Sequence, residues 1–227
     1  MRERIFSLLI PPLLVVAAAI TPVAHADEYQ DAQNRVNRSA DLVNHMRQDP
    51  HLAKLLDEAR GVFIIPKYAK GALFFGGQSG GGVVLIRRNG RWSDPAFYKY
   101  SGTSFGFQAG GSGGSLVMLL MTPMAVRHFE DDSGKWSLSG SVGLNVAIYN
   151  VAAEGTSPAK GDVIVWSDTR GLYGGLSAGV TGITPDRVMD DDYYRRNVDG
   201  REILAGTVMN NGARVLRNAL AARVAER

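Results

Sequence analysis

The chain of 227 residues contains no cysteine. Disulfides, thiolate metal ligands and cysteine nucleophiles are therefore excluded together. The absence fits an oxidising compartment, where a stray thiol would be a liability. Histidine is scarce as well, since beyond residue 26 the chain carries only His45, His51 and His128. No zinc site of familiar ligand spacing is predicted from so few ligands, and no cofactor is expected.

Long apolar runs are also missing, except at the N-terminus. Two early arginines precede an almost unbroken apolar stretch over residues 5–20, and Ala24-His25-Ala26 supplies the small-x-small pattern that signal peptidase cleaves. The stretch is short for a spanning helix, which needs roughly 20 residues. We expect residues 1–26 to be a cleaved secretory signal peptide, which places the protein in the periplasm or cell envelope. An uncleaved N-terminal anchor is the alternative.

The remaining residues, 27–227, are predicted to form a single domain with helices at both ends. Residues 30–59 have apolar positions at spacings of three and four, interrupted at Asp49-Pro50, which predicts two short helices. Residues 186–227 turn helical again. There Met209, Gly212, Leu216 and Leu220 are predicted to share one face, with Arg214 and Arg217 on the other.

Between these helices, residues 61–182 are a succession of short apolar runs separated by Gly-rich turns. The predicted strands are 62–65, 72–75, 83–86, 96–100, 103–107, 116–121, 136–142, 144–149, 163–166 and 172–180. Helices of the length that parallel βαβ units require are absent from this region. We predict an α+β fold: a Gly-rich, coiled antiparallel sheet or partial barrel with the N- and C-terminal helices packed on it.

Positive charge is concentrated in the middle of the chain. Residues 60–104 hold seven basic residues against Asp94 alone, a net charge of +6. Such a block points to an anionic partner. Outside the cytoplasm that partner is expected to be phospholipid, and no nucleic-acid binding is predicted.

Two predicted turns carry the candidate site. One follows the apolar run 62–65, and the other is the hairpin signal Asn89-Gly90. The candidate lipid-binding residues are Lys67, Tyr68, Lys70, Arg87, Arg88, Arg91 and Trp92. Each basic residue near an anionic membrane contributes about 1 kcal/mol, and Trp and Tyr suit the headgroup layer. The alternative is an ordinary solvated rim whose two turns lie at opposite ends of the sheet.

Other motifs point to no reaction or metal. Gly-x-Ser-x-Gly occurs four times, centred on Ser79, Ser104, Ser112 and Ser177. A nucleophile elbow also needs a strand-to-helix turn and a downstream histidine base, so these matches reflect a Gly/Ser-rich composition and no enzyme is predicted. The acidic segment 186–199 could bind Ca²⁺ through carboxylates, but an acidic turn before a helix is the favoured interpretation.

A series of ordered motifs begins at residue 59. In order they are Pro66-Lys67, a Gly-rich turn at 76–82, Trp92-Ser93, Pro95-Ala96-Phe97-Tyr98 and Ser104-Phe105-Gly106-Phe107-Gln108. This series resembles the core of the SYLF domain family. Further on, Arg170-Gly171-Leu172-Tyr173-Gly174-Gly175 and the acidic, Tyr-containing segment at 190–206 are also similar to family motifs. The similarity covers residues 30–206.

The resemblance implies a binding protein. The family is described as lipid-binding, with a preference for anionic and phosphoinositide headgroups, and some eukaryotic members also bind actin. Actin binding is not carried over, since an exported protein need not meet actin. Residues 139–150 depart from the Gly-Pro-Val-Gly segment frequent in the family. The acidic segment 27–59 stands where eukaryotic members have an amphipathic membrane-contacting helix.

The leading prediction is non-enzymatic binding of anionic phospholipid or phosphoinositide-type headgroups at an envelope membrane through a basic surface. The alternative is an envelope structural or interaction protein whose sheet edge and C-terminal helix dock a protein partner. The first depends on lipid charge and on salt, whereas the second is indifferent to lipid charge.

Overall fold

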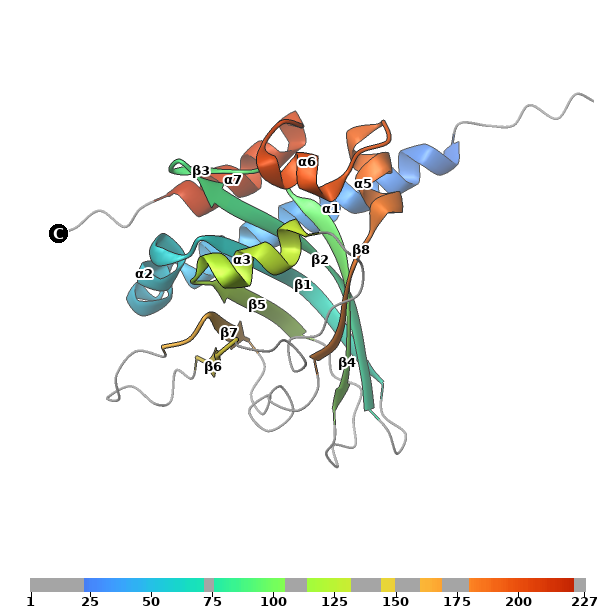
Figure 1. The fold of residues 1–227 in the computed structure, drawn as a ribbon. Coiled ribbons are helices and arrows are strands. Elements are labelled where there is room, and N and C mark those ends of the chain that lie inside the picture. The colour runs from blue at the N-terminus through green and yellow to red at the C-terminus, as the bar shows by residue number, and fades with distance from the viewer. Residues whose placement is uncertain are drawn as a thin grey trace, which may run out of the picture.

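A curled sheet lies at the centre of the molecule, and helices cover its two faces (Figure 1). The computed structural model describes residues 23–71, 76–104, 114–131, 144–149, 160–168 and 180–222. The strands are β1 Gly61–Gly71, β2 Gly76–Arg88, β3 Arg91–Trp92, β4 Ala96–Ser104, β5 Gly114–Leu120, β6 Val146–Ile148, β7 Val163–Ser167 and β8 Val180–Pro185. The helices are α1 Val23–Met46, α2 Pro50–Glu58, α3 Pro123–Glu130, α5 Arg187–Tyr194, α6 Gly200–Ala205, the 3₁₀ turn η3 Asn211–Ala213 and α7 Arg214–Ala221.

The strands follow the order β6-β7-β5-β1-β2-β4-β8, and β3 forms a short hairpin with β2. Every pair of described strands is antiparallel except β6 and β7, which run parallel at one edge. The predicted α+β fold, a coiled sheet or partial barrel with terminal helices packed on it, is confirmed. Within the described residues, none of the helices combines the length and apolar character needed to span a bilayer.

A bulge in β1 contributes to the curl of the sheet. The pairing of β1 with β2 shifts register between Ile64 and Lys67, and the pairing with β5 shifts between Ile65 and Tyr68. Pro66 lies inside the shifted segment. Proline has no N–H to donate to a ladder, so a bulge is where a central strand can accept it. Bulges increase the local twist, which helps these long strands to coil.

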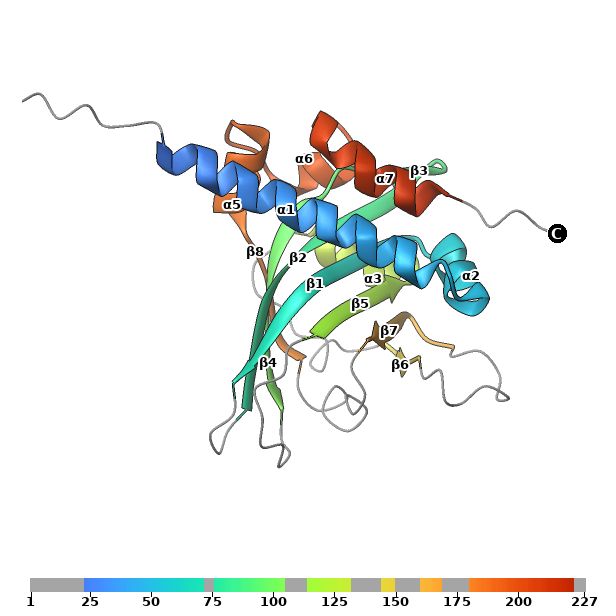
Figure 2. The ribbon, with the colours of Figure 1, turned by 180° about the vertical axis from the view of Figure 1, so that it is seen from behind.

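Successive side chains of the central strands point to opposite faces of the sheet, so alternate residues belong to two different hydrophobic layers. Ile64 and Val83 belong to the layer beneath α1, α2 and α7, whereas Phe63 and Val84 belong to the layer that includes α3 and α6. Figure 2 shows α1 crossing the first of these faces, with β1, β2 and β4 extending past it. The first buried residue of α1 within the described chain is Ala32, so a protein beginning at Asp27 keeps the described core.

Helix ends are defined by local capping. Asp49 caps α2, because its side chain accepts hydrogen bonds from the amides of His51 and Leu52, and Pro50 occupies the first helical position as predicted. Helix α3 was not predicted from sequence, although Thr122-Pro123 carries the same signal. The Thr122 side chain caps α3 by accepting from the amide of Ala125.

Several predicted elements differ from those observed. The first helix is long, with 24 residues. The predicted strand 96–100 and residues 103–104 of the next one lie in the single strand β4, and residues 105–107 lie outside the described residues. Predicted strands 72–75 and 136–142 lie outside the described residues, as does predicted strand 172–180 except for its last residue. Leu216 and Leu220 are buried as expected, but Met209 is 72% exposed. Asn210 caps η3 through its side chain, so Met209 precedes the helix and does not share its apolar face.

Consecutive glycines of β2 allow close packing on opposite faces. A Cβ on Gly82 would lie 2.5 Å from the Phe63 ring and 2.6 Å from the carbonyl oxygen of Ile64. A Cβ on Gly81 would meet the guanidinium of Arg35, with Nη1 at 2.2 Å. The Arg35 head can move aside because it ends a flexible side chain, whereas a packed ring and a strand carbonyl cannot.

We therefore expect Gly82→Ala to lower the free energy of unfolding by about 1–3 kcal/mol, the usual effect of overpacking. Gly81→Ala is the matched control and should change it by less than about 0.5 kcal/mol. Urea denaturation of both variants measures the difference. Equal stability of the two would contradict the close packing at Gly82.

Candidate anion-binding surfaces

The turn between β2 and β3 forms the predicted hairpin. Asn89 and Gly90 both have positive φ, 50° and 77°, as the tight turns favoured in hairpins require. Arg88 pairs directly with Arg91, and Arg87 pairs with Trp92. The structure therefore brings together four of the predicted site residues at one end of the sheet.

Two of these four residues have roles in packing. The Arg87 guanidinium lies 4.5 Å from the centroid of the Trp92 ring and donates to the backbone carbonyls of Leu56 and Asp57, at the end of α2. Trp92 is only 8% exposed and belongs to the hydrophobic layer beneath α1. Contact of Trp92 with a membrane would require its ring to leave this layer.

The other two residues lie at the surface. Arg91 is exposed, and the Arg88 side chain is 51% exposed while it forms an ion pair with Glu130 of α3 at 2.5 Å. Arg60, also exposed, joins them because its carbonyl accepts from the backbone amide of Arg87. We call Arg60, Arg88 and Arg91 the hairpin cations. No local signal in the sequence places Arg60 here, because only the β1–β2 register brings it to the hairpin.

Lys67 lies in β1, well away from the hairpin along the sheet. Its partner across the β1–β2 ladder is Gly81, which precedes Arg88 by seven residues, or about 23 Å at roughly 3.3 Å per residue. The side chains of Tyr68 and Lys70, next in β1, lie outside the described residues. The turn predicted after residues 62–65 is wrong, because these residues continue strand β1, and the structure separates them from the hairpin. Lipid binding by these residues stays a prediction, but one headgroup cannot contact both groups.

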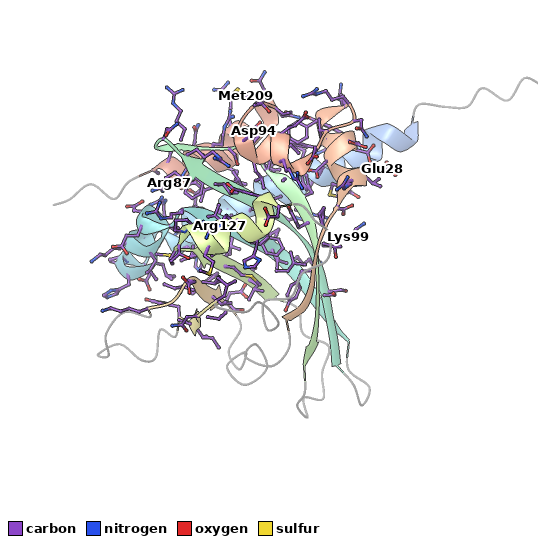
Figure 3. The ribbon with its side chains drawn as sticks, viewed as in Figure 1. Glu28, Arg87, Asp94, Lys99, Arg127 and Met209 are labelled. Carbon is purple, nitrogen blue, oxygen red and sulfur yellow. The ribbon has the colours of Figure 1, made fainter. Side chains whose placement is uncertain are left out.

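Lys67 instead shares a surface with two cations outside the predicted site. Gly81 is paired with Lys67 on one side and with Lys99 of β4 on the other. Directly paired residues point to the same face of a sheet, and the Arg35 guanidinium of α1 lies against that face of Gly81. We call Lys67, Arg35 and Lys99 the cross-strand row. Figure 3 shows Lys99 and Arg87 on opposite sides of the molecule.

The predicted acidic segment is occupied by structural contacts. Asp186 forms an ion pair with Lys99 at 2.9 Å, and the Asp190 carboxylate accepts from the amide of Phe97 at 2.9 Å. Asp191 accepts from the amide of Val198, and Asp199 caps α6. Across the described residues, no three potential ligands gather as a metal site would require. A Gly-x-Ser-x-Gly elbow is likewise unsupported at Ser79, which lies within β2.

A buried ion pair fastens the C-terminal segment to the sheet. Asp94, with a side chain that is 0% exposed, accepts from the Arg217 guanidinium and from the backbone amide of Asn210. Burial raises the pKa of Asp94, although the hydrogen bond from Asn210 and the charge of Arg217 oppose the shift. Asp94 is the one acidic residue in the basic block, and its role is to hold α7 in place.

An α+β domain that presents exposed cations at one end of its sheet has the features of a binding protein. The family model described as "Ysc84: Las17-binding protein actin regulator" matches residues 101–223. The chain belongs to this family, which confirms the predicted SYLF resemblance.

Curated relatives come from two yeasts. Protein YSC84 of Saccharomyces cerevisiae is 30% identical over 159 residues, covering 68% of this chain and 34% of the relative. LAS seventeen-binding protein 3 of the same species is 28% identical with the same coverage. The SH3 domain-containing protein PJ696.02 of Schizosaccharomyces pombe is 26% identical over 164 residues, 70% of this chain and 38% of its own. The chain therefore spans about a third of the length of these relatives.

We expect Asp94→Ala to lower the free energy of unfolding by about 2–4 kcal/mol, because it leaves a partly buried guanidinium and an amide without their acceptor. Chemical denaturation provides the measurement. Asp41→Asn, at an exposed position of α1, is the control. Its free energy of unfolding should stay within about 0.5 kcal/mol of that of the parent protein. An unchanged midpoint for Asp94→Ala would show that α7 is held by packing alone.

Proposed function

We propose that this protein is a non-enzymatic binder of anionic phospholipid headgroups at an envelope membrane, and that the hairpin cations form its contact. The observation that supports this proposal is that Arg60, Arg88 and Arg91 are each exposed at the same end of the sheet. Family membership supports a binding role, and the choice of lipid as the ligand is our own inference from the charge.

The hairpin cations are a reasonable electrostatic contact. Among them, Arg88 forms an ion pair with Glu130, and Arg127 lies exposed one turn earlier on the same helix. Each basic residue near an anionic surface contributes about 1 kcal/mol, so three to four cations give weak, reversible attachment. Such attachment weakens as salt rises, because the charges are exposed and therefore screened.

A protein partner is the second candidate. The family description names Las17 binding and actin regulation, and one relative is named for binding LAS seventeen. The same exposed arginines would then meet an acidic protein surface. Binding that is indifferent to lipid charge, together with a specific partner, would favour this function over the first.

To test the lipid function, we expect Arg60→Glu combined with Arg91→Glu to reduce vesicle binding at least tenfold. Reversing two charges removes about 2 kcal/mol of attraction even before repulsion is counted, which is more than a factor of ten. The measurement is flotation of protein 27–227 with vesicles of rising anionic lipid content, at low and moderate salt.

The control for this experiment carries the same charge change elsewhere. Arg38→Glu combined with Arg196→Glu alters exposed positions of α1 and the segment after α5, and should change flotation much less. Loss of flotation in both double variants would mean that net charge alone governs binding. No flotation of the parent on any vesicle would reject the lipid function.

We also propose export with cleavage after Ala26. This cut would remove only Val23–Ala26 from the described part of α1, about one helical turn, and would leave Ala32 and the rest of the core in place. N-terminal sequencing of protein recovered from producing cells is expected to begin at Asp27. Recovery of the intact chain from the membrane fraction alone would contradict cleavage.

A further inference from the structure

The cross-strand row places three cations around one glycine on the α1 face of the sheet. Lys67 and Lys99 are the two direct neighbours of Gly81 across the ladders to β1 and β4. Between them, the Arg35 side chain reaches from α1 to Gly81. A Cβ added to Gly81 would lie 2.2 Å from the Nη1 atom of Arg35. Lys67 is exposed, and the Lys99 side chain is 63% exposed. The arrangement requires glycine at this position, because any side chain there would displace the guanidinium.

The guanidinium of Arg35 lacks an acceptor in the described structure. Its Nη1 atom is buried and makes no hydrogen bond to any described residue. The group lies 5.9 Å from the centroid of the Phe97 ring, and burial lowers the pKa of Arg35 despite the opposing charges of Asp186 and Asp31. A buried charged donor without an acceptor is unfavourable. Asp186 already holds an ion pair with Lys99.

We propose that the cross-strand row binds a phosphate-class oxyanion, with Arg35 donating from Nη1 and with Lys67 and Lys99 supplying charge from either side. The three cations together with Asp186 and Asp31 sum to a net charge of +1, which remains attractive to an anion. Thr184 of β8 pairs with Lys99 and so shares this face, where its half-buried side chain adds a hydroxyl donor.

The donor set favours a tetrahedral oxyanion over a carboxylate. Phosphate presents three or more acceptor oxygens in different directions, whereas a carboxylate presents two in one plane. Arginine offers a fork of donors and lysine a point charge. Donors that approach from β1, β4 and α1 are therefore best satisfied by a ligand with oxygens on several sides.

This site goes beyond the proposed membrane contact and is independent of it. It lies about 23 Å along β2 from the hairpin cations, and involves none of them. Its ligand can be inorganic phosphate or the phosphate of a lipid headgroup, since the chemistry that recognises both is the same.

The test is calorimetric titration of protein 27–227 with inorganic phosphate at constant ionic strength. We expect Arg35→Gln to raise the Kd about tenfold or more, as removal of a charge-assisted hydrogen bond does. Gly81→Ala should produce a similar loss, because its Cβ moves the guanidinium while every charge is retained. Arg38→Gln, the same charge change at an exposed position of the same helix, should stay within about twofold.

Two results would overturn the site. One is that the parent protein binds no phosphate at concentrations up to about 10 mM, since a weaker Kd would be of no use. The other is that Arg38→Gln raises the Kd for phosphate as much as Arg35→Gln does. Melting curves check that each variant is folded, and Gly81→Ala keeps the test decisive if Arg35→Gln is unstable. Titration with a soluble short-chain phosphatidic acid, which needs no membrane surface, then identifies the ligand. Binding of this lipid that is tighter than that of inorganic phosphate and is lost in Arg35→Gln supports a headgroup, whereas binding no tighter than that of inorganic phosphate supports the free ion. Phosphate binding by a parent that never floats would reject the membrane function and leave this site standing.

Discussion

The architecture depends on a short part of β2 that has no side chains. Gly81 admits the Arg35 head of α1 on one face, and Gly82 admits the Phe63 ring on the other. A side chain at Gly82 would force the neighbouring strand away, whereas one at Gly81 would displace only the Arg35 guanidinium. Because β2 lies between β1 and β4, loss of this close approach would affect both ladders and the curl of the sheet.

Charged side chains then divide into two kinds, those that join elements and those that face solvent. Arg47 joins three helices, since it donates to the last carbonyls of α7, at Ala219 and Leu220, and pairs with Asp57 of α2. Arg87 and Arg217 are similarly occupied by α2 and by Asp94. These contacts satisfy carbonyls and carboxylates that would otherwise be buried unpaired.

This division explains why the candidate site could be predicted only in part. Arg88 and Arg91 flank an Asn-Gly turn, so local sequence was enough to place them together. Trp92 has the residue type of an interfacial anchor, but its burial depends on α7 packing over β3, which is a contact distant in sequence. Local sequence groups Lys67 with the hairpin because both follow apolar runs and are basic, and no local signal reveals that Lys67 lies inside β1, far along the sheet from the hairpin.

The amino-acid sequence by itself determined the elements whose causes are local. These include the break at Asp49-Pro50, the alternating strands, the hairpin at Asn89-Gly90 and the α+β class. Tertiary structure alone decided which cations share a surface, because strand register and helix packing join residues far apart in the chain. Arg35 and Lys99 are 64 positions apart, and only the antiparallel ladders and the crossing of α1 bring them to the same glycine.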